Sequence, residues 1–147
     1  MIYLADTNFS LRLAIKRNPQ HQIIRQAVRT LKRRGDEICI VPQTCVEFWN
    51  VATRPVKNNG FGFPVADADF FLRLIERIFP LLPDDARVHQ KWRKLVLTFG
   101  VSGVQVHDAR IVAAMLVHQI THILTFNVSD FTRYSSIGIV AVDPNKV

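Results

Sequence analysis

Short apolar runs alternate with amphipathic segments along the whole chain. The runs are four to six residues long and apolar on both faces, which predicts buried strands at 2–5, 38–41, 78–82, 121–126 and 139–142. Between them, apolar residues recur at helical spacing, which predicts helices at 8–18, 20–34, 42–52, 66–77, 84–98 and 108–118. This alternation favours an α/β fold in which helices cover both faces of a parallel sheet.

Residues with special backbone preferences mark the ends of these segments. Asn8 is expected to cap the first helix and Gly35 to end the second, while Pro42 suits the first turn of the third. The segment 54–64 is rich in Gly, Pro and Asn and is the one long loop. Because no repeat or linker interrupts the pattern, residues 1–147 are expected to form one domain.

Composition excludes several classes of protein. With 48% apolar residues, the chain can bury a core and is not disordered. Its longest apolar run, 111–117, is too short to span a membrane, and Asp6 and Asn8 interrupt any N-terminal signal sequence. Cys39 and Cys45 lack the spacing of a CxxC pair, so they indicate buried thiols in a reducing cytoplasm.

Positive charge is concentrated in the first quarter of the chain. Residues 1–35 contain eight Lys and Arg residues against the single acid Asp6, and so carry the whole net charge of +7. The remaining residues contain eleven basic and eleven acidic side chains. Such a concentration either attracts phosphate groups or forms a solvated helix face. Composition leaves both open, and a nearby acidic cluster would favour a nucleic-acid substrate.

Four carboxylates follow apolar stretches and are expected to converge. Asp6 and Asp130 come directly after predicted strands, Glu47 lies about one turn into a helix that leaves a strand, and Asp108 lies in the first turn of its helix. In open parallel sheets the carboxyl ends of the strands form the ligand crevice. Each acid alone is an ordinary helix cap or turn residue. Their shared position along one sheet edge is what predicts a site.

A cluster of acids is typical of a hard divalent cation. Mg²⁺ and Mn²⁺ prefer carboxylate oxygens and water, whereas acids brought together without a cation repel one another. A cation bound there would supply an activated water and charge neutralisation for phosphodiester hydrolysis. No Cys and His residues have zinc-site spacing. His107, His118 and His122 are therefore interpreted as surface or packing residues.

At these positions the chain resembles a known family. Asp6-Thr7-Asn8, Val46-Glu47-Phe48-Trp49, His107-Asp108-Ala109-Arg110 and the segment Thr125 to Phe131 (TFNVSDF) are similar to the signature positions of PIN domains, above all of VapC-type toxins of bacterial toxin–antitoxin pairs. The resemblance extends over essentially the whole chain. It implies a three-layer α/β/α fold with a five-stranded, mainly parallel sheet. It also implies an endoribonuclease that uses Mg²⁺ or Mn²⁺, is commonly a homodimer, and is silenced by a cognate antitoxin.

The resemblance also assigns roles to residues. Asp6 and Asp108 would be the principal metal ligands, and Glu47 and Asp130 would complete the catalytic acidic site directly or through water. Four further residues would support them. Asn8 and Thr125 would hold water or a carboxylate, Asn127 would brace the loop that carries Asp130, and Arg110 would pair with an acid or a phosphate. For Arg110, an ordinary salt bridge is an equal alternative.

Part of the chain falls outside the resemblance, and three other functions compete with the nuclease. The run 49–55 and the aromatic residues Phe61 and Phe63 either shape specificity or form a plain helix end and surface loop. A receiver domain or a dehalogenase-type phosphatase would need a second acid near Asp6, where Ala5, Thr7 and Asn8 stand. The remaining alternative is a non-catalytic RNA- or protein-binding module with the same fold. The four acids argue against it, because a binding module gains nothing from charges that repel.

Overall fold

A parallel sheet of four strands lies at the centre of the structure. The computed structural model describes all 147 residues. Its strands are β1 (Ile2–Ala5), β2 (Glu37–Cys39), β3 (His122–Leu124) and β4 (Val140–Val142), in the order β2-β1-β3-β4. All neighbouring strands are parallel, and Leu4 of β1 pairs with Cys39 on one side and Ile123 on the other. The predicted parallel sheet is therefore confirmed.

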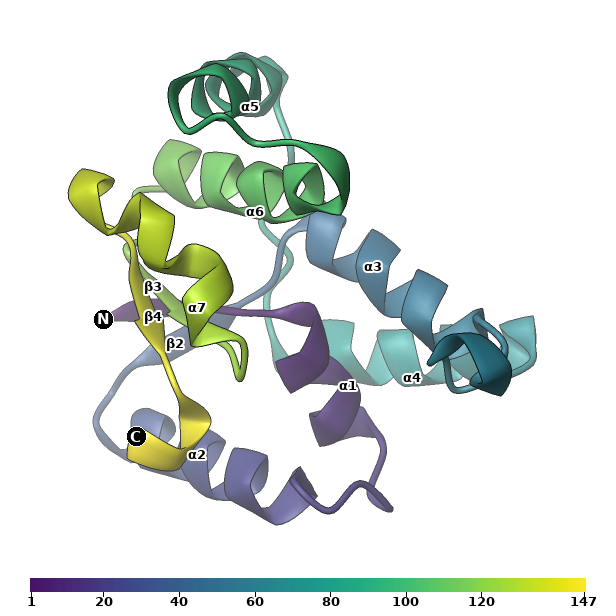
Figure 1. Cartoon of the computed structure of the whole chain (residues 1–147). Coiled ribbons are helices and arrows are strands. Elements are labelled where there is room, and N and C mark those ends of the chain that lie inside the picture. The colour runs from purple at the N-terminus through teal and green to yellow at the C-terminus, as the bar shows by residue number, and fades with distance from the viewer.

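Seven α-helices surround the sheet (Figure 1). They are α1 (Thr7–Ala14), α2 (His21–Arg33), α3 (Pro42–Thr53), α4 (Val65–Ile78), α5 (Ala86–Thr98), α6 (Val106–Val117) and α7 (Val128–Phe131). Short 3-10 segments are η1 (Val56–Asn58), η2 (Gly103–Gln105), η3 (Thr132–Ile137) and η4 (Pro144–Lys146). In Figure 1, α2 lies below the sheet and α6 above it, with α5 outside α6. None of the helices combines the length and hydrophobicity needed to cross a lipid bilayer.

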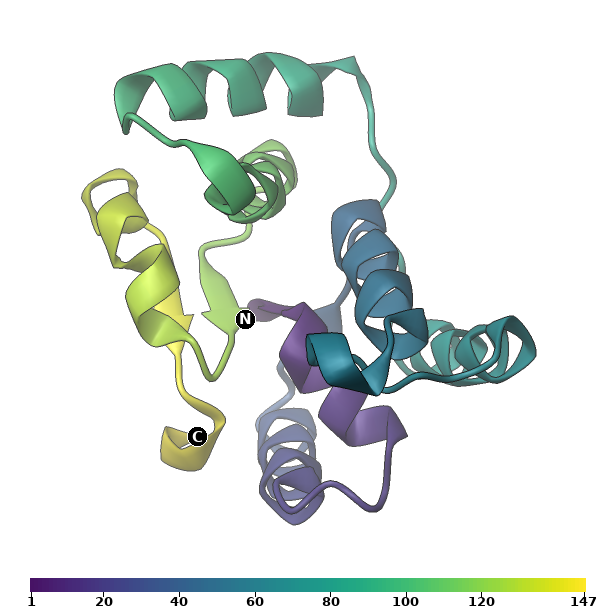
Figure 2. The same cartoon turned by 45° about the vertical axis from the view of Figure 1, so that its right-hand side comes forward.

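Each face of the sheet has its own hydrophobic core. Successive side chains of a strand point to opposite faces. Tyr3 and Ala5 of β1 therefore lie in one core with residues of α1 to α4, whereas Leu4 and the free thiol Cys39 lie in the other with residues of α5 and α6. Figure 2 shows α3 beside α1 and α4, and α3 packs against both.

Helices α2 and α6, which lie on opposite sides of the sheet, differ in sequence because they differ in burial. In α2 the apolar stripe Ile24, Ala27, Val28 and Leu31 is buried, while the basic residues of the other face are exposed. In α6 all of 111–115 is buried, because this helix is enclosed between the sheet and α5. These two helices lie close to their predicted bounds.

The expectation of a fifth strand is wrong. Helix α4 continues to Ile78, and only Leu81 pairs with the sheet, as a single parallel bridge to Ile40. The backbone N–H of Ile40 donates to the carbonyl of Pro80, and the N–H of Leu82 donates to the carbonyl of Ile40. Pro80 and Pro83 have no N–H and flank this short segment, so the ladder cannot extend in either direction. The apolar run 78–82 is thus a helix end followed by one bridge.

Two predicted helix starts also need correction. Asn8 does not cap α1, because Asp6 is the N-cap and its side chain accepts from the backbone N–H of Thr7. Helix α5 begins at Ala86 rather than 84, with Asp85 as its N-cap. Pro42 occupies the first turn of α3 as predicted, and Gly35 follows the last turn of α2 with a φ of +81°. Both errors arise because several neighbouring polar residues could serve as caps.

The loop 54–64 folds back onto the helix that precedes it. The N–H of Phe61 donates to the carbonyl of Val51, and the N–H of Phe63 donates to the carbonyl of Ala52. The two aromatic rings stack with centroids 5.7 Å apart and are half-buried against the first core. A Cβ atom at Gly60 would collide with the backbone of Arg54. The loop is therefore packed tightly against α3.

Candidate active site

Asp6 is a buried carboxylate at the carboxyl end of β1. Its backbone N–H donates to the carbonyl of Leu124 in β3, which holds it at the edge of the sheet. Its side chain is bound as the cap of α1, because Oδ1 accepts from the N–H of Thr7 at 2.7 Å. The residue is only 6% exposed. The capping hydrogen bond and the backbone bond to the sheet thus hold Asp6 in a buried position, although acids are rarely buried in folded proteins.

Thr125 holds the other oxygen of Asp6. This threonine follows β3 and is fully buried, and its hydroxyl donates to Oδ2 of Asp6 at 2.8 Å. The same hydroxyl oxygen accepts from the backbone N–H of Asn127 at 3.0 Å. Because the Thr125 hydroxyl binds both Asp6 and the backbone of Asn127, the loop that leads to Asp130 is tied to the Asp6 carboxylate.

Glu47 projects from α3 and is bound at both oxygens. The hydroxyl of Thr7 donates to Oε2 at 3.0 Å, and the amide of Gln43 donates to Oε1 at 3.1 Å. Gln43 lies one helical turn before Glu47, so the two side chains share a face of α3. Thr7 therefore joins the two acids: its N–H binds Asp6 and its hydroxyl binds Glu47.

Three of the four acids line one open pocket. Its volume is about 380 Å³, and Glu47 of α3, Asp108 of α6 and Asp130 of α7 all border it. Asp6 does not line the pocket, but its charge acts on Asp108. The structure thus brings acids from four distant parts of the sequence into one electrostatic environment.

This arrangement raises the pKa values of two of the acids. Burial, reinforced by the charges of Glu47 and Asp130, raises the pKa of Asp6 to about 6, although its hydrogen bonds from Thr125 and Thr7 limit the rise. Burial, followed by the charges of Asp6, Glu47 and Asp130, raises the pKa of Asp108 to about 7. Both carboxyls therefore bind a proton more tightly than an ordinary aspartate, because their ionised forms lose solvation and repel one another.

The acids do not form a ready-made cage for a cation. No group of three or more Asp, Glu, His or Cys side chains is arranged so that it could hold a metal ion. The expected joint coordination by four acids is therefore not present in their side-chain positions. Mg²⁺ is commonly held by one or two carboxylates, with water and substrate phosphate in its other positions. The four acids fit this mode of binding, because all their donor atoms are oxygens and a cation would relieve the repulsion between their charges.

Comparison with known proteins identifies the family. The sequence matches the PIN domain family over residues 3–136. The chain belongs to the PIN domain family. The match includes all four acids and every element from β1 to η3 in whole or in part. No curated protein sequence matches the chain.

Solved structures share the fold of this PIN domain at low sequence identity. VapBC-1 from nontypeable Haemophilus influenzae has a TM-score of 0.71 at 20% identity and covers 99% of this chain and 100% of its own. VapBC2 from Rickettsia felis, bound to a DNA fragment from its promoter, has a TM-score of 0.70 at 15% identity, with 97% and 98% covered. VapC20 from Mycobacterium tuberculosis, described as a sarcin-ricin loop cleaving toxin, has a TM-score of 0.64 at 20% identity, with 97% and 98% covered.

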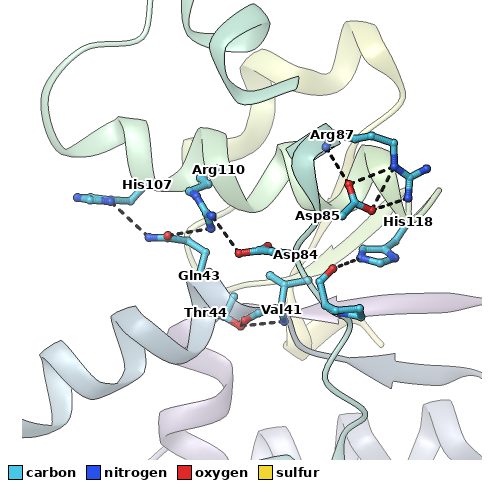
Figure 3. Close-up of polar contacts among 10 residues, drawn as sticks. Val41, Gln43, Thr44, Asp84, Asp85, Arg87, His107, Arg110 and His118 are labelled. Carbon is cyan, nitrogen blue, oxygen red and sulfur yellow. Dashed lines mark hydrogen bonds and ion pairs between the residues drawn. The ribbon is translucent and has the colours of Figure 1, made fainter. Parts of the chain in front are cut away.

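Arg110 of the PIN domain pairs outside the acidic cluster (Figure 3). Its Nη2 lies 2.9 Å from Oδ2 of Asp84, and its Nη1 lies 3.5 Å from Oε1 of Gln43. Of the alternatives left open by the sequence, the structure shows the salt bridge. Asp84, which lies just before α5, is the partner that holds Arg110.

The other predicted supporting residues make fewer contacts. Asn127 braces the loop through its backbone N–H on Thr125, and Asp130 is tied to it because its own N–H donates to the carbonyl of Asn127. Asn8 is half-buried one residue after Thr7. His107 borders the pocket, with Nδ1 at 3.4 Å from the amide nitrogen of Gln43.

Three residues beside the acids were assigned no role from the sequence. Thr7 and Gln43 bind Glu47, and Arg12 brings a positive charge near Asp6. The Arg12 guanidinium lies 4.5 Å from the centre of the Phe126 ring, and its Nη1 is buried without a hydrogen-bond partner. Burial lowers the pKa of Arg12, and the charge of Asp6 opposes this. Only the spacing of Gln43 and Glu47, four residues apart on a helix, was a usable signal.

Proposed function

We propose that this PIN domain is an endoribonuclease that uses Mg²⁺ or Mn²⁺ to hydrolyse RNA phosphodiester bonds. The observation that carries the proposal is the placement of Glu47, Asp108 and Asp130 around one open pocket, with the buried Asp6 close enough for its charge to raise the pKa of Asp108. Carboxylates with raised pKa values in a cleft are more typical of functional sites than of structural ones. Repelling acids destabilise a fold unless a cation neutralises them.

Each acid has a part in the proposed mechanism. Asp6 and Asp108 would be the principal ligands, and Glu47 and Asp130 would complete the site directly or through water. A divalent cation bound there supplies an activated water and neutralises charge on the leaving oxygen. Hydrogen bonds from Thr125 and Thr7 fix the orientation of the Asp6 carboxylate. The open pocket leaves room for a phosphate group beside Asp108 and Asp130.

The charge distribution supports RNA as the substrate. The basic side chains of α2 that include Arg25, Arg29, Lys32 and Arg33 are exposed, and none forms an ion pair. Unpaired basic side chains attract the phosphate backbone and release its counterions on binding. One structure of the same fold, VapC20, is described as a sarcin-ricin loop cleaving toxin. This supports cleavage of RNA by this chain.

We also propose that the chain is the toxin of a type II toxin–antitoxin pair. The support is that structures of the same fold include VapBC assemblies and a toxin–antitoxin complex from Klebsiella pneumoniae. A cognate antitoxin and a homodimer are part of this proposal. Co-expression with the product of a small neighbouring gene, followed by co-purification and measurement of molar mass, tests both partners.

Replacement of Asp6 tests the nuclease. Asp6→Asn should abolish Mn²⁺-dependent cleavage of RNA while leaving the circular dichroism spectrum unchanged, because it removes a charge but little volume. The matched control is Asp69→Asn, which makes the same change in the exposed Asp69–Arg73 pair of α4 and should cleave normally. Normal cleavage by Asp6→Asn would remove Asp6 from the mechanism. RNA binding without cleavage by the parent protein would support the non-catalytic binding module instead.

A further inference from the structure

The side chain of Gln43 connects the candidate acid Glu47 with α6. Gln43 is 7% exposed, and its Nε2 donates to Oε1 of Glu47 at 3.1 Å. At the other end of the amide, Oε1 accepts from Nη1 of Arg110 in a longer contact of 3.5 Å. Figure 3 shows this amide extending from α3 toward α6. The donor end of the amide therefore meets an anion, and the acceptor end meets a cation.

This arrangement determines which way the amide points. A glutamine nitrogen carries two N–H groups, and the second can reach Nδ1 of His107, which lies 3.4 Å away. If the amide turned by 180°, its oxygen would face the Glu47 carboxylate and its N–H groups would face the Arg110 guanidinium. Both contacts would become repulsive, so the charges on either side hold Gln43 in one orientation.

Arg110 is itself held in place. Its Nη2 pairs with Oδ2 of Asp84 at 2.9 Å, and both side chains are only about one third exposed, at 35% and 30%. Asp84 follows the segment in which Leu82 donates to the carbonyl of Ile40. Arg110 is therefore linked to the chain beside the sheet, and Gln43 receives its hydrogen bond from an anchored partner.

The contacts form one network across the two helices that carry candidate acids. Gln43 and Glu47 lie four residues apart on α3, and Arg110 lies two residues after Asp108 on α6. We propose that Gln43 is a positioning residue that orients the Glu47 carboxylate and, through Arg110 and Asp84, fixes its place relative to Asp108. The consequence for catalysis rests on the proposed nuclease function, whereas the orientation of Glu47 does not.

Removal of the Gln43 amide would leave Glu47 with the Thr7 hydroxyl as its remaining protein partner. A glutamate side chain has three rotatable bonds, so one hydrogen bond leaves several orientations open. Groups that orient metal-binding carboxylates typically change metal affinity or activity by about 10- to 100-fold when they are removed. The expected defect is therefore in the arrangement of the site and not in binding of RNA.

One variant removes the amide. Gln43→Leu removes both hydrogen bonds with little change in volume. It should weaken Mn²⁺ binding by about 10- to 100-fold, measured by electron paramagnetic resonance without RNA. It should also lower kcat while changing KM for RNA less than about twofold, as expected when a positioning group is removed.

A double-mutant cycle with Glu47→Gln provides the decisive comparison. If Gln43 acts through Glu47, Gln43→Leu should have little further effect on Mn²⁺ binding in the Glu47→Gln background. An equal decrease in both backgrounds would overturn the inference. The control is Gln90→Leu on α5, an exposed glutamine away from the acids, which should bind Mn²⁺ like the parent.

Urea unfolding of the four cycle variants distinguishes failure of this inference from failure of the proposed function. Coupling between positions 43 and 47 in the free energy of unfolding is expected if the hydrogen bond orients Glu47. Absence of coupling would contradict the inference whatever the activity. Coupling in a parent protein that neither binds Mn²⁺ nor cleaves RNA would support the orientation of Glu47 and overturn the nuclease proposal.

Discussion

At the scale of single residues, Asp6 combines strong hydrogen bonding with unfavourable burial. Thr7 and Thr125 occupy its two oxygens, yet its pKa is still raised to about 6. Burial therefore outweighs two hydrogen bonds that both favour the ionised form. An ionisable side chain at this position therefore lowers stability. As pH rises, the folded protein keeps the Asp6 proton after the unfolded chain has released it.

This difference makes the stability of the metal-free protein depend on pH. The unfolded chain releases the Asp6 proton near pH 3.8 and the folded protein near pH 6. Well below pH 3.8 both states are protonated, and as pH rises through 6 the folded state loses stability relative to Asp6→Asn, by about 3 kcal/mol in total. Urea unfolding of both proteins in EDTA from pH 4 to pH 7 measures this. A difference that stays constant with pH would show that Asp6 ionises normally.

A divalent cation should reverse this destabilisation. At pH 7 the buried Asp6 carboxylate of the parent is ionised, so Mg²⁺ should stabilise the parent more than it stabilises Asp6→Asn. The same urea titration with Mg²⁺ in place of EDTA provides the comparison. Equal stabilisation of both proteins would place the cation away from Asp6.

At the scale of elements, hydrogen bonds outside regular structure decide where segments lie. The loop 54–64 has a composition typical of mobile loops, yet its backbone bonds to Val51 and Ala52 hold it against α3. Gly60 makes this possible because the chain passes so close to Arg54 that no side chain fits. The loop therefore borders the acid pocket through Arg54 as a packed element.

Gly60→Ala should detach this loop. The added Cβ would overlap the Arg54 backbone, so the chain must shift, at a cost of about 3 kcal/mol in the free energy of unfolding. The control Gly100→Ala has a φ of +59° but open space around its Cβ, and should cost only about 1 kcal/mol. Urea unfolding measures both, and faster tryptic cleavage after Lys57 should accompany the first. Equal destabilisation by both would mean that the close approach at Gly60 relaxes without strain.

At the scale of the whole molecule, charge is segregated. The acids lie at one edge of the sheet, whereas the exposed, unpaired basic side chains belong to α2. This helix covers one face of the sheet (Figure 1). If no cation were bound and the rest of the surface carried no positive charge, the acidic site would repel RNA. Attraction by α2 would act at long range and depend on salt.

Neutralising part of α2 tests this attraction. Arg29→Gln combined with Lys32→Gln should weaken RNA binding and lower the slope of log affinity against log salt by about 0.7 for each phosphate that the protein no longer neutralises. The control pair Arg73→Gln and Arg77→Gln removes the same charge from α4, where acids are close by, and should change the slope little. Binding titrations at several salt concentrations give the slopes. Identical slopes for both pairs would make the α2 surface a solvated face without a role in binding.

Much of the fold follows from periodicity, and the error at 78–82 shows its limit. An apolar run of five residues is equally compatible with a buried strand and with a helix end. The helix forms here because α4 buries Ile75 and then Phe79 in the first core, while Pro80 and Pro83 prevent a ladder. Local sequence contains these prolines, but their effect depends on which neighbour the segment meets.

The neighbourhood of the acids was predictable, and their detailed arrangement was not. Residues after parallel strands lie at one edge of a sheet, so sequence alone predicted that Asp6, Glu47, Asp108 and Asp130 lie near one another. The hydrogen bonds from Thr7 and Gln43 to Glu47 depend on how α1 and α3 pack, since Thr7 and Glu47 are 40 residues apart. Their assignment as the catalytic site stays a prediction for mutagenesis.

By itself, the sequence determined the alternation of strands and helices, the parallel sheet, and the edge at which the acids gather, because these depend on periodicity and on chain direction. The tertiary structure alone decided the number of strands, the direction of each carboxylate, and the raised pKa values of Asp6 and Asp108. Burial and hydrogen bonding between distant residues arise only when the elements pack. No local pattern along the chain contains them.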